Sequence, residues 1–552
     1  MKTSVVLLLF VIIGLGCTCE IHGQNNTNLL SRDFIKTDGA RFIDGNGKEY
    51  IIKGMGFWGG NNPVAPDSFQ ESDFSNMADI GFNSIRLYLS ANFFENTSTD
   101  PVSYKEEIWA WLDPRIMWAK KYNMTLILNM HFTPGASNIS DRNLFTDYNL
   151  QNRLVALWRV IAEYYKNEPV IAGYDIVNEP TANPVDGENA PYANTFTLYQ
   201  SIVQRVVDAI REVDTNHIII VERLWINNVT NPNDQQDDWQ NINGNYNFVQ
   251  INDPCANYAL TYHCYEPCRY IHQTVGDDGS APDRVYPNPA TIARWGKTEN
   301  NGMQLPVQDI LSPEATDYII LTNKFHCAPD AVHNTARIDM VFKNLPSDAT
   351  VWINKVTVKE YDENNIFIRN VVYLDFDYKF DNNAFSNNSV NISVDNTGRF
   401  LKATGPVTDG ISRTNNVQFI ITKGNYYELS VEVKGSNIGN ASVYPTFFVA
   451  NRPDVRGNTK DFLEEVYTLP LNYITKITGV PAYIGEFGVH AGNFLDNHYG
   501  INRGADKWIE DVYDIFKKYK INSNFHPYYE REIRPKVHEA LADALRKAFS
   551  IP

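Results

Sequence analysis

The hexapeptide DIVNEP (Asp175–Pro180) directly follows the apolar run 170–174. An apolar run that stops at Asn-Glu-Pro is typical of a buried parallel strand that ends in a loop. In a parallel barrel the active site lies at the carboxyl ends of the strands, so Asn178 and Glu179 are candidate site residues. A chance Asn-Glu-Pro turn is the alternative that this triplet alone leaves open.

A second glutamate occupies the same kind of position far downstream. Glu486 ends the short apolar run in PAYIGEFG (481–488) and is flanked by glycines. Two strand-end carboxylates indicate glycoside chemistry, in which one acid protonates the leaving oxygen and the other group attacks or activates water. A separation of about 5 Å goes with retention and one of about 6.5 to 9.5 Å with inversion, and the sequence does not give this distance.

Size and composition limit the classes of protein. The chain has 552 residues, which predicts two domains, and its 13% aromatic content suits both a packed core and stacking against carbohydrate. The net charge of −17 disfavours nucleic acid and anionic membranes as partners. We therefore expect a neutral polysaccharide or oligosaccharide as the partner, no nucleic acid, and a monomer.

The N-terminus predicts export. Met1 and Lys2 precede the apolar run 5–16, which is too short to span a bilayer and indicates a signal peptide over 1–23. Secretion is the expected location. A lipid anchor at Cys17 is the less favoured alternative, because the residues before this cysteine depart from a lipobox. No later stretch is long and apolar enough for a transmembrane helix.

Four cysteines remain after the predicted leader, and we expect disulfides or buried thiols from them, with the pairing open. No second Cys/His pair completes a zinc set, so no metal is predicted. The four are Cys255, Cys264, Cys268 and Cys327.

Strand and helix patterns alternate along most of the chain, which predicts an α/β fold, a (β/α)8 TIM barrel built from 24–302 and 453–552. A hairpin over 33–54 is expected to close the bottom of the barrel. The predicted strands are 54–57, 83–89, 125–131, 170–174, 217–221, 258–265, 481–486 and 521–527.

An inserted domain interrupts this alternation. Between Tyr265 and Glu486 lie about 220 residues, whereas one loop, one helix and one strand need about 40 to 60. Within this stretch the hydrophobic period changes to two, with Asn, Asp and Gly between the runs. We predict an all-β jelly-roll or β-sandwich domain over 303–452, between barrel strands six and seven, rather than an irregular loop.

Seven polar residues end the predicted strands. Each alone has an ordinary structural explanation, such as an ion pair or a packed ring. The presence of seven such residues in a chain with eight predicted strands alternating with helices indicates a functional site. They are Arg86, His131, Asn178, Glu179, His263, Tyr265 and Glu486.

With these residues in place, the chain resembles glycoside hydrolase family 5, a family of retaining barrel enzymes. The resemblance covers about 33–300 and 455–550. The stretches that carry it are SIRLYLS (84–90), LILNMHFTPG (126–135), DIVNEP (175–180), LTYHCYEP (260–267) and YIGEFG (483–488).

The resemblance implies a role for each residue and no cofactor. Glu179 looks like the acid/base and Glu486 the nucleophile. Arg86 and Tyr265 would keep the nucleophile ionised, and Asn178 would donate to the sugar 2-hydroxyl. The remaining sugar contacts would come from His131 and His263, with Trp58 and Trp225 as stacking platforms.

One position departs from the family pattern. The family has a tryptophan at the end of strand eight, whereas this chain reads NSNFHPYY (522–529). Phe525 or His526 would take its role, which leaves the sugar and linkage preference open.

The resemblance implies a secreted retaining endo-β-1,4-glucanase, a cellulase acting by double displacement. A β-mannanase, a β-1,3-glucanase, an exo-acting β-glycosidase and, least favoured, a non-catalytic glycan-binding protein remain alternatives. The insert weakly resembles carbohydrate-binding modules, with the segment 351–358 preceding 427–433 as in a permuted module. Sugar binding and a purely structural role are both open for it.

Overall fold

The computed structural model describes residues 33–57, 69–99, 101–136, 143–182, 191–226, 248–271, 285–294, 300–376, 389–394, 401–453, 455–489, 503–528 and 539–550. The predicted signal peptide 1–23, Cys17 and Trp58 lie outside these residues. Within them, no helix is both long and apolar enough to cross a bilayer. Cys255, Cys264 and Cys327 are free, and Cys264 and Cys327 are buried thiols.

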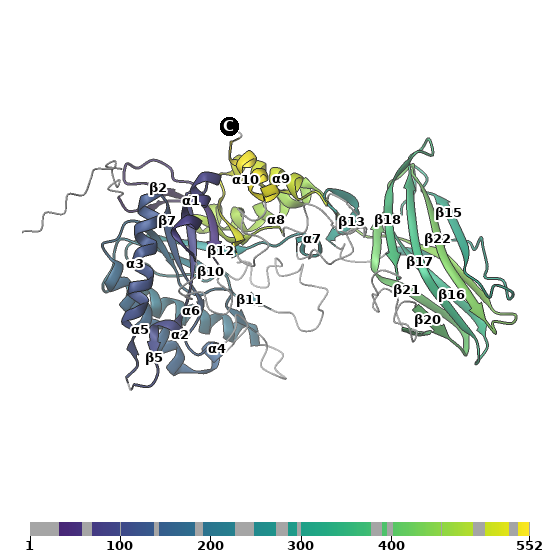
Figure 1. The fold of residues 1–552 in the computed structure, drawn as a ribbon, viewed down its shortest axis with the longest axis horizontal. Helices are drawn as coiled ribbons and strands as arrows, with labels where there is room; N and C mark the ends of the chain where they lie inside the picture. Colours follow the sequence, from purple (N-terminus) through teal and green to yellow (C-terminus); the bar gives the residue numbers. More distant parts are fainter. Residues whose placement is uncertain are drawn as a thin grey trace, which may run out of the picture.

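Eight parallel strands close into a barrel, which confirms the predicted fold class (Figure 1). The strands follow chain order around the barrel, and the last pairs with the first, as β26 does with β3. Each strand is short and almost wholly buried, as expected where helices cover the outside. They are β3 (Lys53–Phe57), β4 (Ser84–Ser90), β7 (Thr125–Phe132), β8 (Ile171–Asp175), β10 (Ile218–Glu222), β12 (Tyr258–His263), β25 (Ala482–Phe487) and β26 (Asn522–Tyr528).

Amphipathic helices surround the barrel. In α5 the Asp147 carboxylate caps the helix by accepting from the backbone N–H of Asn149. Its buried residues, such as Leu154, Trp158 and Ile161, recur at helical spacing and face the strands. The larger helices are α1 (Glu71–Ile80), α3 (Glu106–Lys121), α5 (Tyr148–Tyr165), α6 (Pro191–Arg211), α8 (Lys460–Tyr473), α9 (Ala505–Tyr519) and α10 (Glu539–Ser550), and the short ones are α2 (Ala91–Phe94), α4 (Asn143–Thr146) and α7 (Cys268–Ile271).

A hairpin of β1 (Lys36–Asp38) and β2 (Arg41–Ile43) closes the amino-terminal end of the barrel. Ile35 and Phe42 are buried in a small cluster with residues from the beginnings of the barrel strands, among them Ile218. Because this end is filled by apolar side chains, the opposite end is left for the polar groups.

Two antiparallel sheets form the inserted domain between β12 and β25. One sheet has the order β14-β23-β16-β21-β13-β24, and the other β15-β22-β17-β20-β19 with β18 beside β17. Their inner faces enclose a separate hydrophobic core. The strands are β13 (Asn288–Arg294), β14 (Asn300–Gln304), β15 (Ile319–His326), β16 (Thr335–Leu345), β17 (Thr350–Tyr361), β18 (Phe367–Asp375), β19 (Asn391–Val394), β20 (Leu401–Thr404), β21 (Val407–Ile420), β22 (Tyr426–Ser436), β23 (Ser442–Asn451) and β24 (Arg456–Asn458).

The first sheet includes residues on both sides of the predicted 303–452 span, because β13 and β24 pair with each other at its edge. Arg294 of β13 and Arg456 of β24 both form ion pairs with Glu465 of α8, which ties the sandwich to the barrel. Figure 1 shows the sandwich standing beside the barrel, with β13 toward it.

Candidate active site

Arg86 of β4 organises the carboxyl ends of the barrel strands. Its three guanidinium nitrogens donate to the Asp175 carboxylate (2.8 Å), the Glu486 carboxylate (2.6 Å) and the Asn178 amide oxygen (2.8 Å). The arginine is wholly buried. Its planar fork therefore holds groups from β8 and β25 in one fixed arrangement.

Glu486 has the surroundings of an ionised carboxylate. Beside Arg86, it accepts from the hydroxyls of Tyr265 (2.6 Å) and Tyr88 (3.2 Å). Burial alone would raise the pKa of Glu486, but the charges of His263, His526 and Arg86 outweigh it and hold that pKa well below its usual range. A carboxylate kept ionised by several donors is suited to nucleophilic attack.

Tyr265 and Tyr88 remain donors to Glu486. Burial, and then the charge of Glu486, raise the pKa of both hydroxyls well above the usual range. Each tyrosine therefore keeps its proton and stabilises the carboxylate by a hydrogen bond.

Glu179 follows β8. Its backbone φ of 40° lies in a region that residues other than glycine rarely adopt. Its N–H donates to the Glu222 carboxylate (2.8 Å), which stabilises this conformation. Its side chain is 20% exposed, whereas that of Glu486 is 5% exposed. Backbone strain of this kind is concentrated at functional sites.

The two candidate carboxylates face each other across His263. Its Nδ1 lies 2.9 Å from Glu179 Oε1 and 3.5 Å from Glu486 Oε2. One side-chain atom from each of the three residues lies within 4.8 Å of the others. An oxygen of Glu179 therefore lies closer to an oxygen of Glu486 than the range of about 6.5 to 9.5 Å that goes with inversion.

Glu222, at the end of β10, contacts both Glu179 and His263. It accepts from Trp225 Nε1 (2.9 Å), and its other oxygen accepts from the Glu179 backbone. Burial raises the pKa of Glu222 to about 7. Although burial alone would lower it, the charges of Glu222 and Glu486 and the contact with Glu179 raise the pKa of His263 to about 9.

Asn178 and His131 border the exposed side of Glu179. The Asn178 amide oxygen is held by Arg86, while its amide nitrogen is buried and has no hydrogen-bond partner among the described residues. His131 lines the same small hollow as Glu179, and its ring stacks on Tyr88 at 4.4 Å. Burial lowers the pKa of His131 well below its usual value, so this ring is neutral.

At strand eight the structure distinguishes the two proposed substitutes for tryptophan. Phe525 is fully buried and packs against Phe487 in the core. His526 is half-buried beside the nucleophile candidate, with Nε2 3.8 Å from Glu486 and its ring next to Tyr88. Only His526 of this pair lies where it could contact a sugar.

The structure brings together nine of the ten residues selected from the sequence, and Trp58 lies outside the described residues. Trp225 is half-buried, 6.2 Å from the His263 ring. Sequence reasoning missed Tyr88 and Glu222. Glu222 ends β10 just as Glu486 ends its run, so a strand-end search could have found it. Tyr88 follows Arg86 by two residues in β4, and a tyrosine among apolar neighbours is ordinarily a packed ring, so it gave no separate signal.

The linked titration of Glu222 and His263 predicts the pH dependence of stability. The pKa of Glu222 is about 7 in the folded chain against an ordinary value of 4.5, and that of His263 is about 9 against 6.5. Both groups therefore bind protons more tightly when the chain is folded. Through these two groups folding takes up protons in this window, so their contribution to the free energy of unfolding should fall as the pH rises from 4.5 to 9, opposed by the depressed pKa of His131. Glu222→Gln should remove roughly 3 kcal/mol of that decline, measured by urea unfolding at several pH values.

Asp253→Asn is the matched control, because Arg211 holds the pKa of this carboxyl below its usual value despite its burial. Its titration lies below the window, so this variant should be less stable by a similar amount at every pH from 5 to 9. If the free energy of unfolding changed with pH in the same way in Glu222→Gln and in wild type, the raised pKa of Glu222 would be contradicted.

A closed parallel barrel with two glutamates at the ends of its fourth and seventh strands, their oxygens within 4.8 Å, defines a site of the barrel glycosidase class. Residues 43–306 match the family model "Cellulase (glycosyl hydrolase family 5)". The barrel of this chain belongs to glycoside hydrolase family 5.

Several characterised proteins are similar to this chain. Endoglucanase C of Acetivibrio thermocellus is 30% identical over 206 residues, which are 37% of this chain and 52% of that protein. Endoglucanase 3 of Fibrobacter succinogenes is 26% identical over 260 residues, 45% of this chain and 36% of that protein. A solved endoglucanase from Thermotoga maritima aligns at 14% identity with a TM-score of 0.44, over 89% of this chain and 96% of that chain. The chain thus spans about half or less of these curated relatives.

Proposed function

We propose that the protein is a retaining endo-β-glycanase whose preferred substrate is a β-1,4-linked glucan. The observation that carries the proposal is the pair Glu179 and Glu486, with oxygens within 4.8 Å of each other and in different surroundings. The names of the two relatives quoted above, both endoglucanases, favour glucan over the other polysaccharides.

In the first step Glu486 attacks the anomeric carbon and forms a glycosyl ester, while protonated Glu179 gives its proton to the departing glycosidic oxygen. In the second step the Glu179 carboxylate takes a proton from water, and that water releases the sugar from Glu486. Both steps invert the anomeric carbon, so the product keeps the starting configuration.

The surroundings of the two carboxylates support this division of roles. Glu486 is held by three donors and kept ionised, as a nucleophile requires. Glu179 is more exposed and contacts only one side-chain partner among its described hydrogen bonds, His263, which leaves its carboxyl group open to a glycosidic oxygen as an acid/base requires. The buried Asn178 amide nitrogen is available to donate to the 2-hydroxyl of the sugar bound at the cleavage point.

Product analysis tests the proposal. The protein should release short β-1,4-gluco-oligosaccharides from carboxymethylcellulose and mixed-linkage glucan, and proton NMR of the first products should show the β-anomer. Products from mannan or laminarin alone would move the preference to β-mannanase or β-1,3-glucanase. An initial α-anomer would overturn the retaining mechanism, and no product from any of these polymers would leave the glycan-binding alternative.

Export belongs to the same proposal. The predicted leader 1–23 would deliver the enzyme outside the cytoplasm, where its polymeric substrate is found. Amino-terminal sequencing of the protein from the culture medium checks this, and recovery in the membrane fraction with a modified Cys17 would instead favour the lipid anchor.

A further inference from the structure

Four aromatic rings lie side by side on the outer face of the sandwich sheet that contains β15, β22, β17 and β18. His326 pairs with Tyr426, Tyr426 with Tyr361, and Tyr361 with Phe367, each directly across neighbouring strands. We name these four residues the aromatic row. Since neighbouring strands are about 4.8 Å apart, the row extends about 15 Å across the sheet.

The rings of the row face solvent rather than the core. Tyr426 is 38% exposed and Phe367 is 52% exposed. The His326 ring stacks on Tyr426 at 4.3 Å, with an angle of 19° between the planes. The alternate residues Phe325 and Tyr427 stack on each other, Tyr427 buried in the core of the sandwich and Phe325 partly buried against it. The core therefore has its own aromatic residues, and the rings of the row lie outside it.

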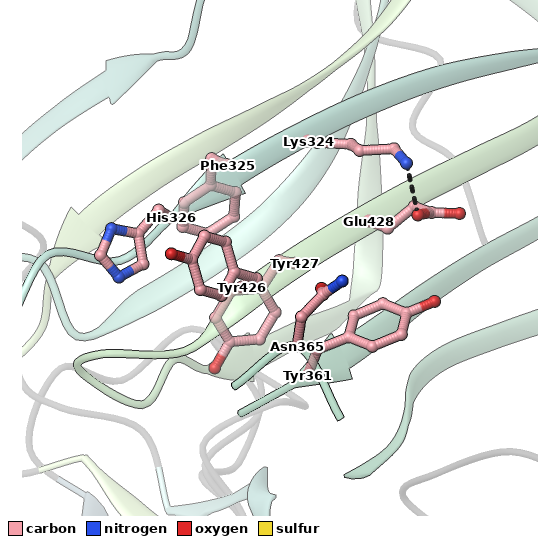
Figure 2. Close-up of a pocket in the computed structure, with 8 residues that line it drawn as sticks. All are labelled: Lys324, Phe325, His326, Tyr361, Asn365, Tyr426, Tyr427 and Glu428. Atoms are coloured by element: carbon pink, nitrogen blue, oxygen red, sulfur yellow. Dashed lines mark ion pairs between the residues drawn. The ribbon is translucent and has the colours of Figure 1, made fainter. Parts of the chain in front are cut away.

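Figure 2 shows polar groups beside three residues of the row, His326, Tyr426 and Tyr361. Lys324 and Glu428 form a 2.7 Å ion pair next to His326 and Tyr426, and Asn365 lies beside Tyr361. Together with Phe325 and Tyr427 these residues line an open hollow of about 340 Å³, and Phe367 continues the row beside it, with its ring 5.9 Å from that of Tyr361. A hollow of this size with aromatic walls and a few polar groups is typical of a small-molecule or oligosaccharide site.

The residues that line the hollow suit a sugar ligand. A pyranose ring has an apolar C–H face, which packs on an aromatic ring, and hydroxyls at its edge, which need donors and acceptors. The hollow offers both kinds of group. Its two charged groups, Lys324 and Glu428, neutralise each other, so it offers no net charge for an anionic polymer or a lipid headgroup. A row of rings suits an extended chain of sugars better than a single one.

We propose that the aromatic row and its hollow form a glycan-binding surface, separate from the barrel site, that holds a neutral polysaccharide strand. The choice of a β-glucan as that strand rests on the proposed function. The surface would keep the enzyme on its polymer between cleavage events, which raises the effective concentration of the substrate at the barrel.

The test uses the full chain with Glu486→Ala, so that the ligand is not degraded, and calorimetric titration with cellohexaose. Two binding sites are expected. Adding Tyr426→Ala and Phe367→Ala should weaken one site at least about tenfold and leave the other, in the barrel, unchanged. Tyr444→Ala, a half-buried tyrosine of β23 in the other sheet, is the matched control and should keep both sites.

With Glu486 intact, the same two row substitutions should lower retention of the enzyme on insoluble cellulose about tenfold. The values of kcat and KM on soluble cello-oligosaccharides should stay within about twofold of wild type, and thermal melts should coincide. Unchanged retention and unchanged site number would overturn the inference while leaving the proposed function standing. An equal loss in Tyr444→Ala, or binding only to heparin or to anionic vesicles, would also overturn it.

The two proposals fail in different ways. If the protein cleaves none of the glucans yet loses binding to an insoluble polysaccharide only when the row is substituted, the proposed function fails and the binding surface remains. For that purpose the retention assay includes glucomannan, mannan and laminarin beside cellulose.

Discussion

Glu486→Ala should lower kcat by about 10⁵-fold while the chain stays folded, because the ester with the sugar can no longer form. Asp175 still neutralises Arg86 in this variant, so the arginine is not left as an unpaired buried charge. The measurements are kcat on an aryl cellobioside and circular dichroism. Turnover at the wild-type rate would remove Glu486 from the role of nucleophile.

Azide distinguishes the two glutamates by the configuration of the product. In Glu486→Ala the space left by the side chain admits azide on the face opposite the leaving group, so activity should return with an α-glycosyl azide. Glu179→Ala is the matched control. Here the ester forms first and azide attacks it, so the product should be the β-azide. The loss in this variant should be about 10²- to 10⁴-fold and smallest for substrates with good leaving groups, which need no acid.

The second large effect is expected at Arg86. Arg86→Met removes the buried cation from two carboxylates and leaves the Asn178 amide unsupported. Breaking a buried pair in this way costs about 3 to 5 kcal/mol of stability. The pKa of Glu486 should rise when this cation is lost, so the acid limb of the kcat/KM profile should move to higher pH.

Arg211→Met separates the catalytic effect from the loss of stability. Arg211 is also buried and donates from Nε and Nη2 to Asp253, at 2.7 and 3.0 Å, far from Glu486 in the fold. It should cost a similar free energy of unfolding but leave kcat and the pH profile of the folded enzyme unchanged. If both variants gave the same pH profile as wild type, Arg86 would be a structural residue only.

The barrel could be predicted from the sequence because its pattern is local. Several strands, such as 170–174 before DIVNEP, are apolar runs followed by polar residues, and the long helices carry their own 3.6-residue period. The bounds of the insert were harder to predict. β13 and β24 are short strands outside the predicted span and pair only with each other and with β21, and such pairings over long sequence distances leave no periodic trace.

The sequence by itself determined the residue types and their strand ends, and so the two glutamates and the arginine that the site requires. The tertiary structure decided what depends on distance. It brought Glu179 within 4.8 Å of Glu486, placed Glu222 behind His263, and put His526 rather than Phe525 beside the nucleophile candidate. It also aligned four rings from four strands into the aromatic row. Distances between side chains on different strands of the barrel, and pKa values set by burial, arise only when distant segments pack together. No single stretch of the sequence therefore predicts them.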